Sequence, residues 1–118
     1  MSKLTAELLV AEVRRLAAEN PDATYFRNAS TCSYLHGTAA GGVGCIIGQA
    51  ILAIDPDLRD FLRQVDGESI HAIHERLGLY YGPEIQWLSR VQFKQDCGNP
   101  WGKAVSLANE EASHVSED

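Results

Sequence analysis

The segment Tyr34–Ile54 constrains the fold most, because an alternating pattern gives way there to a helical one across a glycine-rich turn. The loop 37–44 holds four glycines in eight residues, which permits positive φ angles and a close approach of backbone. After Cys45, apolar residues recur at helical spacing on more than one side, as is typical of a nearly buried helix. These residues are Ile46, Ile47, Ala50, Ile51 and Ile54. The sequence therefore predicts a core built around one central helix that starts at Cys45.

Further helices are predicted from their start signals and apolar stripes. Thr5 is placed to cap a first helix, flanked by Leu4 and Leu9 as a hydrophobic staple, and Asn20-Pro21 ends it. Cap-and-proline pairs start later helices at positions 55–56, 82–83 and 99–100. The stripes behind these starts are Leu58, Phe61, Leu62 and Val65; Ile85, Trp87, Leu88 and Val91; and Trp101, Ala104, Val105 and Ala108, with another short stripe in Ile70, Ile73, His74 and Leu77 ended by Gly78.

A small sheet is predicted between the first helix and the central one. Residues 22–36 are rich in aromatic and strand-favouring side chains, which indicates a short hairpin, with a third strand near Val43. The predicted class is therefore α+β: a mainly helical single domain of about six helices, with a small β-hairpin after the first helix. The globular part is expected to span residues 1–109, and the acidic stretch 110–118 is expected to fray.

Charge and hydropathy exclude several functional classes. The 118 residues carry a net charge of −6 with no basic cluster, which argues against nucleic-acid binding. The longest apolar run, near 43–54, is broken by glycines and is too short to cross a bilayer, and the N-terminus lacks the pattern of a signal peptide. Three cysteines fit reduced thiols better than a disulfide framework. We therefore expect a cytoplasmic protein with no membrane partner.

Cys45 is the residue with the most chemical potential, because a thiol at a helix start faces unpaired backbone N–H groups. Together with His36 it could form a cysteine–imidazole pair for nucleophilic catalysis, and this cysteine-dependent enzyme is the alternative function. The apolar neighbours Val43, Ile46 and Ile47 favour instead a buried thiol that packs as a small hydrophobe. Catalysis is therefore the secondary hypothesis, and core packing is the first.

A zinc-stabilised module is a second alternative, because Cys32, His36, Cys45 and Cys97 have the donor types of a tetrahedral site. Their spacing contains no Cys-x-x-Cys pair, so neither a metal nor another cofactor is expected. A bridge between Cys32 and Cys45 would require an oxidising compartment.

Two other segments carry polar or glycine-rich patterns without a matching catalytic motif. His71, His74 and Glu75 read His-x-x-His-Glu, which is neither the zincin order nor its inverse, so a metal site is disfavoured. His74 lies four residues after Ile70 and is therefore predicted at the edge of the core. The Gly37–Gly44 loop has no lysine after its last glycine and is not a phosphate-binding motif, although it leaves room for a small ligand.

Large aromatic side chains gather in the C-terminal third of the chain. Trp87 and Trp101 are predicted to fill the core first. Trp87, Tyr80 and Tyr81 are the candidate binding residues, since tryptophan and tyrosine are enriched at interaction hot spots.

Several motifs together resemble those of small proteins of actinobacterial phages (mycobacteriophage-like) and their hosts. They are Glu19-Asn-Pro21, Cys32-Ser-Tyr34, Gly44-Cys-Ile-Ile-Gly-Gln-Ala50, Val91-Gln-x-x-Gln-Asp-x-Gly98 and Pro100-Trp-Gly-x-Ala-Val105. The family has no assigned activity, so the resemblance implies a setting and no catalytic residue. That setting is a phage accessory protein in the bacterial cytoplasm. The predicted function is non-catalytic: binding of a host or phage protein, or self-association.

Overall fold

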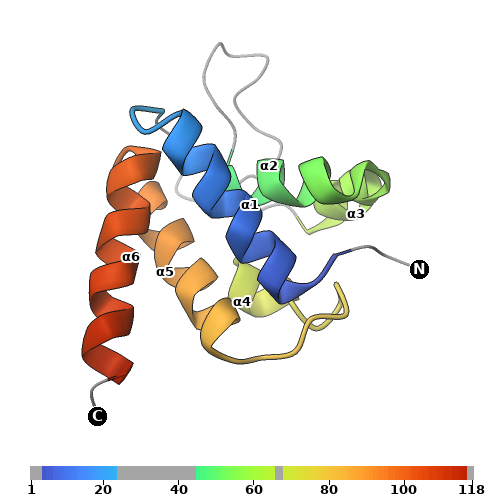
Figure 1. Ribbon diagram of the computed structural model, residues 1–118. Helices are drawn as coiled ribbons and strands as arrows, with labels where there is room; N and C mark the ends of the chain where they lie inside the picture. Colours follow the sequence, from blue (N-terminus) through green and yellow to red (C-terminus); the bar gives the residue numbers. More distant parts are fainter. Residues whose placement is uncertain (1–3, 24–44, 66–67, 117–118) are drawn as a thin grey trace.

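The described part of the chain is a bundle of short and long helices. The computed structural model describes residues 4–23, 45–65 and 68–116 (Figure 1). In chain order the elements are α1 (Ala6–Glu19), α2 (Ile46–Ile54), a 3-10 turn η1 (Pro56–Leu58), α3 (Arg59–Gln64), α4 (Ile70–Ile73), α5 (Pro83–Asp96) and α6 (Trp101–Ser116).

The α+β class predicted from the sequence is wrong. The described residues form six α-helices and one 3-10 turn and contain no strand, so the domain is helical. The physical reason is that helix faces packed on one another supply the whole described core, and no sheet contributes to it. The predicted hairpin at 22–36 and the strand near Val43 fall almost wholly in residues 24–44, outside the described residues.

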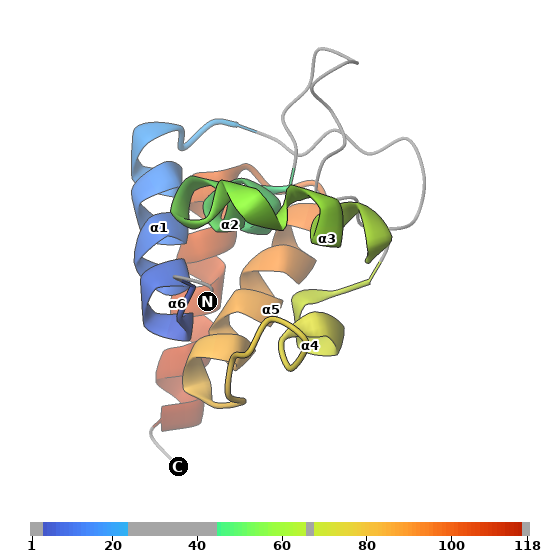
Figure 2. The same ribbon diagram turned by 90° about the vertical axis from the view of Figure 1, so that its right-hand side faces the viewer.

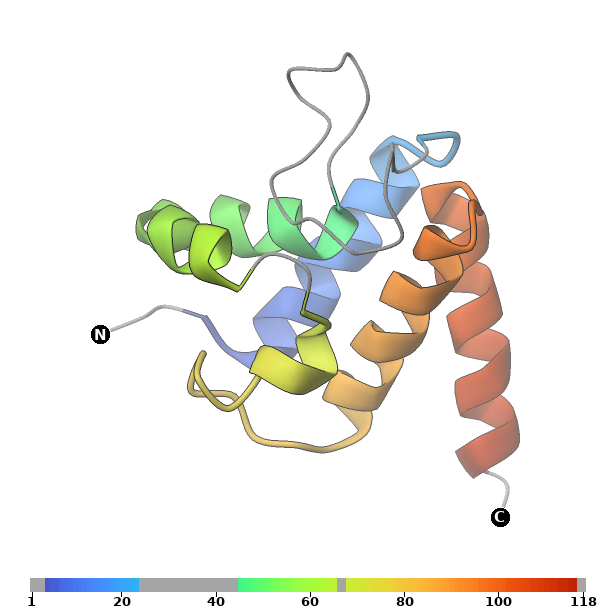
Figure 3. The same ribbon diagram turned by 180° about the vertical axis from the view of Figure 1, so that it is seen from behind.

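The helices α1 and α5 organise the packing. The central α5 contacts α1, α2, α4 and α6, and α1 contacts α2, α5 and α6. In Figure 1, α5 lies between α1 and α6, and α6 runs along the outer edge of the molecule. Figure 2 shows α2 and α3 crossing one end of this group, and Figure 3 shows α4 beside the first half of α5. The N-terminal ends of α1 and α5 lie at the same end of the molecule.

Most of the predicted helix starts are confirmed. The hydroxyl of Thr5 accepts a hydrogen bond from the Leu8 N–H at 3.1 Å, and the Asp55 carboxylate accepts one from the Asp57 N–H at 3.2 Å. Pro83 stands at the first position of α5, as the cap-and-proline pattern predicts. The stripe that begins at Ile70 forms only one helical turn, α4, and the chain then turns through Gly78, whose φ of 78° suits glycine.

The core is apolar and is supplied by every helix. It includes Cys45 and the predicted central-helix residues Ile46, Ile47, Ala50 and Ile51, all fully buried, which confirms that α2 is a core helix. On α3 the burial is one-sided: Leu62 is fully buried, whereas Phe61 is only half-buried against the core. Both residues belong to the predicted stripe of this segment; the prediction is confirmed for Leu62, whereas Phe61 packs only at the edge of the core.

The last helix extends beyond the predicted domain boundary at residue 109. It continues to Ser116, and Glu111 in its final turns forms ion pairs with α5: to Lys94 Nζ at 2.7 Å and to Arg90 Nε at 3.6 Å. These contacts explain why part of the acidic stretch, read as a solvated tail from its composition, is helical.

Candidate functional site

The thiol of Cys45 lies at the start of α2, as predicted, and is fully buried. Cys45 occupies the N-cap position, where its side chain makes no capping hydrogen bond. The backbone N–H of Ile46, the first residue of α2, has no acceptor within the helix. It donates instead to the side-chain oxygen of Gln95 on α5, at 2.7 Å. A residue 49 positions away in the chain therefore caps α2.

A second glutamine repeats this arrangement one helical turn earlier on α5. The side-chain oxygen of Gln92 accepts the N–H of Ile70, the first residue of α4, also at 2.7 Å. The amide nitrogens of both glutamines point to the same sulfur: Cys45 Sγ lies 3.7 Å from Gln92 Nε2 and 3.5 Å from Gln95 Nε2. One face of α5 thus caps two helices at once, and the Cys45 thiol fills the space between the two amides.

Sequence reasoning identified Cys45 and missed the two glutamines that surround it. A signal was present, because Gln92 and Gln95 continue the spacing of Ile85 and Leu88 along the buried stripe of α5. Polar side chains in such a stripe are buried and must find partners. Their amides each offer one acceptor and two donors, which suits a remote cap.

The predicted cysteine–imidazole and zinc sites gain no support from the described residues. His36 and Cys32 lie outside the described residues. Of the other two candidate zinc ligands, Cys45 is buried in the core and Cys97 is exposed at the end of α5. No group of three or more potential metal ligands occurs within 4–23, 45–65 and 68–116. The surroundings of Cys45 resemble a capped helix junction rather than an open reaction site.

The two histidines of α4 and the turn after it pack against Tyr81. His74 is 8% exposed, which confirms its predicted place at the core edge, and its Nδ1 lies 2.8 Å from the carbonyl oxygen of His71. Since a carbonyl only accepts, Nδ1 carries the proton. The rings of His71 and His74 lie 5.5 Å and 5.6 Å from the Tyr81 ring, between centroids. These contacts hold Tyr81 against α4.

Trp87 belongs to the core rather than to an open surface. It is 4% exposed, and its indole N–H donates to Asn109 Oδ1 on α6 at 2.8 Å. The guanidinium of Arg14 on α1 lies over the ring, 4.4 Å from its centroid. Trp87 therefore joins α1, α5 and α6, and only its edge reaches a shallow hollow of about 270 Å³ beside Pro83 and Glu84.

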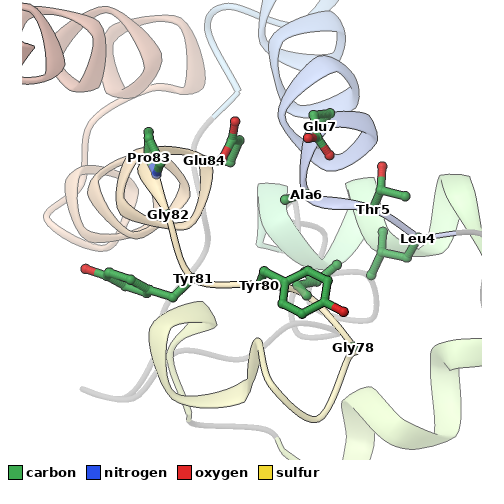
Figure 4. Close-up of a pocket in the computed structure, with 11 residues that line it drawn as sticks. Leu4, Thr5, Ala6, Glu7, Gly78, Tyr80, Tyr81, Gly82, Pro83 and Glu84 are labelled. Carbon is green, nitrogen blue, oxygen red and sulfur yellow. The ribbon is translucent and has the colours of Figure 1, made fainter.

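Tyr80 and Tyr81 flank a hollow that we call the α1–α5 groove. Its volume is about 360 Å³, and it lies between the start of α1 and the segment that leads into α5. Its lining residues are Leu4, Thr5, Ala6 and Glu7 from the α1 side, and Gly78, Leu79, Tyr80, Tyr81, Gly82, Pro83 and Glu84 from the α5 side (Figure 4). Tyr80 is 91% exposed, the most exposed large apolar side chain described.

The two tyrosines have different parts in this groove. In Figure 4 the Tyr80 ring extends toward Leu4 and Gly78, on the groove side, whereas the Tyr81 ring turns the other way. The hydroxyl of Tyr81 accepts a hydrogen bond from Gln86 Nε2 at 3.1 Å, in addition to its contacts with the histidine rings. Tyr81 thus anchors the segment, whereas the ring of Tyr80 is left exposed at the groove.

The described lining of the groove is negatively charged. Glu7 and Glu84 line it, and none of its described lining residues is a lysine or arginine, although Arg14 borders the adjacent hollow that Glu84 also lines. Neither carboxylate forms an ion pair with any described residue, unlike Glu12 and Glu19 further along α1. Those two hold Arg15, and the hydrogen bonds that its guanidinium donates to Glu12 and then to Glu19 raise its pKa above the ordinary value.

The comparisons with known proteins identify no relative: no protein family, curated protein or solved structure matches this chain. Among the described helices, none combines the length and the apolar character required to span a bilayer. Function must therefore be argued from the groove and from the buried cluster.

Proposed function

We propose that this protein is a non-catalytic binding module that holds a segment of a partner protein in the α1–α5 groove. The observation that carries the proposal is Tyr80, 91% exposed at a hollow whose lining includes the buried residues Leu4 and Leu79. Exposed tyrosine beside a concave apolar surface is the composition of an interaction hot spot, because its ring buries a large area with little loss of conformational freedom.

The rigidity around the groove supports binding with little rearrangement. One wall is the first turn of α1, fixed by the Thr5 cap and by the buried Leu4 and Leu9. The other wall is anchored by Tyr81 and by Pro83 at the start of α5. A preformed site spends less of its binding energy on ordering its own side chains.

The resemblance of the sequence motifs to proteins of actinobacterial phages provides the setting of the proposal. In that setting the partner is a host or phage protein in the bacterial cytoplasm. The cysteine-dependent enzyme is less favoured, because the Cys45 thiol is fully buried and a substrate would reach it only after the core opens.

Selection from a displayed library of random peptides tests the proposal. Wild-type protein should enrich peptides that Tyr80→Ser fails to retain, while Phe93→Ser retains them. Phe93 is a matched control, since it is 62% exposed on α5 and is not among the residues that line the α1–α5 groove. Thermal unfolding of both variants should match the wild type. Failure to enrich any peptide, or equal loss with both variants, would contradict the groove as the binding site.

The same proposal separates partner binding from self-association. Sedimentation of wild-type protein at rising concentration should show a monomer. A dimer that Tyr80→Ser dissociates would show that a second copy of this chain occupies the groove, which would replace the partner-segment proposal.

A further inference from the structure

We propose that the α1–α5 groove selects a basic partner segment, with an arginine or lysine side chain placed between the Tyr80 ring and the carboxylates of Glu7 and Glu84. A basic occupant presupposes the binding function proposed above and adds the chemistry of the ligand. The first support is charge complementarity: two carboxylates line the groove, and none of the described residues that line it carries a positive side chain.

The carboxylates of the groove form no ion pair with a described residue, whereas several other described carboxylates do. Glu12 and Glu19 are occupied by Arg15, and Glu68 is bonded to Arg76 at 2.7 Å. Glu7 and Glu84 have no such partner among the described residues, although both stand in the first turn of a helix. A guanidinium or ammonium group in the groove would give them one.

The helix starts at the groove do not reverse its charge. The N-terminal ends of α1 and α5 each contribute roughly half a positive charge from their unpaired N–H groups. Glu7 and Glu84 carry one full negative charge each at neutral pH and stand in those same first turns. The sum remains negative, so a phosphate or carboxylate ligand is disfavoured where a cation is attracted.

The aromatic side chain supplies the other half of the recognition. A cation over the face of a tyrosine is attracted by the negative face of the ring, and the aliphatic stem of arginine or lysine can lie along an apolar surface. Tyr80 offers an uncovered ring, and Leu79 and Pro83 border the same groove. This protein already uses the same contact internally, where Arg14 lies over Trp87.

The test uses the peptides that wild-type protein selects from the random library, resynthesised with each arginine replaced by citrulline, its neutral isostere, and each lysine acetylated. We expect the selected peptides to be rich in arginine or lysine. We expect the neutral versions to bind at least about tenfold more weakly by fluorescence anisotropy. Tyr80→Phe should retain the affinity for the basic peptides and Tyr80→Leu should lose it, because only the former keeps an aromatic face.

The double variant Glu7→Gln/Glu84→Gln tests the local charge. It should bind the basic peptides roughly five- to tenfold more weakly, a change of about 1–1.4 kcal/mol. Asp22→Asn/Glu110→Gln removes the same total charge from exposed positions outside the groove and should change affinity by less than about twofold.

The outcomes distinguish the ligand chemistry from the binding function. Selected peptides without positive charge, or equal effects of the two double variants, would overturn the basic ligand while leaving the groove as a binding site. Anionic peptides among the selected sequences would show that the helix N-termini dominate and would also overturn it. Absence of any selected peptide would overturn the binding function and the basic ligand together.

Discussion

Replacing Gln95 by methionine should destabilise the protein substantially although it barely changes the volume of the side chain. In the native structure the Gln95 side-chain oxygen accepts the buried Ile46 N–H at 2.7 Å. Methionine fills nearly the same space but its thioether is a poor acceptor. The Ile46 N–H would then be buried without a partner, a loss of about 1–3 kcal/mol.

Two further contacts are lost in the same substitution. The Gln95 amide nitrogen donates to Asp96 Oδ1 at 3.1 Å and lies 3.5 Å from the Cys45 sulfur. The first bond is partly exposed and the second has a weak acceptor, so together they add about 1 kcal/mol at most. We therefore expect the free energy of unfolding to fall by about 2–3 kcal/mol, a large share of the ~5–15 kcal/mol of a typical domain.

Urea denaturation followed by far-UV circular dichroism measures this change. The transition midpoint should fall while the slope with urea concentration stays constant, because the native fold is kept. Gln64→Met is the matched control, since Gln64 is exposed at the end of α3, and it should shift stability by less than about 0.5 kcal/mol.

The effects of the two glutamines should also be coupled. Gln92→Met leaves the Ile70 N–H without its acceptor, and both amides contact Cys45. In a double-mutant cycle we expect an interaction energy of about 0.5 kcal/mol or more. A loss below about 0.5 kcal/mol for Gln95→Met alone would refute the remote cap, because it would mean that Ile46 finds another acceptor at no cost.

Three further predictions concern packing and thiol access. Gly102→Ala should lower the free energy of unfolding by about 1–3 kcal/mol despite the better helix propensity of alanine. The added Cβ would stand 3.0 Å from Pro21 Cβ and 3.1 Å from the Pro21 carbonyl oxygen. Unchanged stability would show that the junction of α1 and α6 can adjust to the added methyl group. When a thiol reagent is added and the labelled residues are identified by peptide mapping, the exposed Cys97 should react fast, and the buried Cys45 should react only as the protein unfolds. Rapid labelling of Cys45 in the native protein would instead favour the enzyme alternative. Leu62→Ala should cost about 2–5 kcal/mol of unfolding free energy, and a loss under about 1 kcal/mol would contradict the assigned packing of α3.

Helix positions were predictable because their signals are local. Three such signals are the Thr5 cap, the proline at position 83 and the apolar run after Cys45. Each acts only on residues a few positions away from it, and the structure confirms all three. The burial of Cys45 followed from its apolar neighbours in the same way. Local patterns of this kind define elements and their inward faces.

The remote contacts were not predictable in that way. Gln95 and Ile46 are 49 residues apart, and nothing in either neighbourhood shows that they meet. The α1–α5 groove likewise joins residues 4–7 to residues 78–84, so Tyr80 could be named as a binding candidate while Glu7 and Glu84 were missed. The predicted α+β class is wrong for a different reason: the described helices pack on one another and form their shared core without a strand.

The two ends of α5 carry the proposed binding groove and the two remote caps separately. Its first turn carries Glu84 at the groove, whereas its last turns carry Gln92 and Gln95, which cap α4 and α2. At 1.5 Å of rise per residue, Glu84 and Gln92 lie about 12 Å apart along the helix, so a change at one end need not disturb the other. Groove variants should therefore fold normally, and a loss of peptide binding in them reports on recognition. The glutamine variants should do the reverse, with lowered stability and unchanged affinity in the fraction that remains folded.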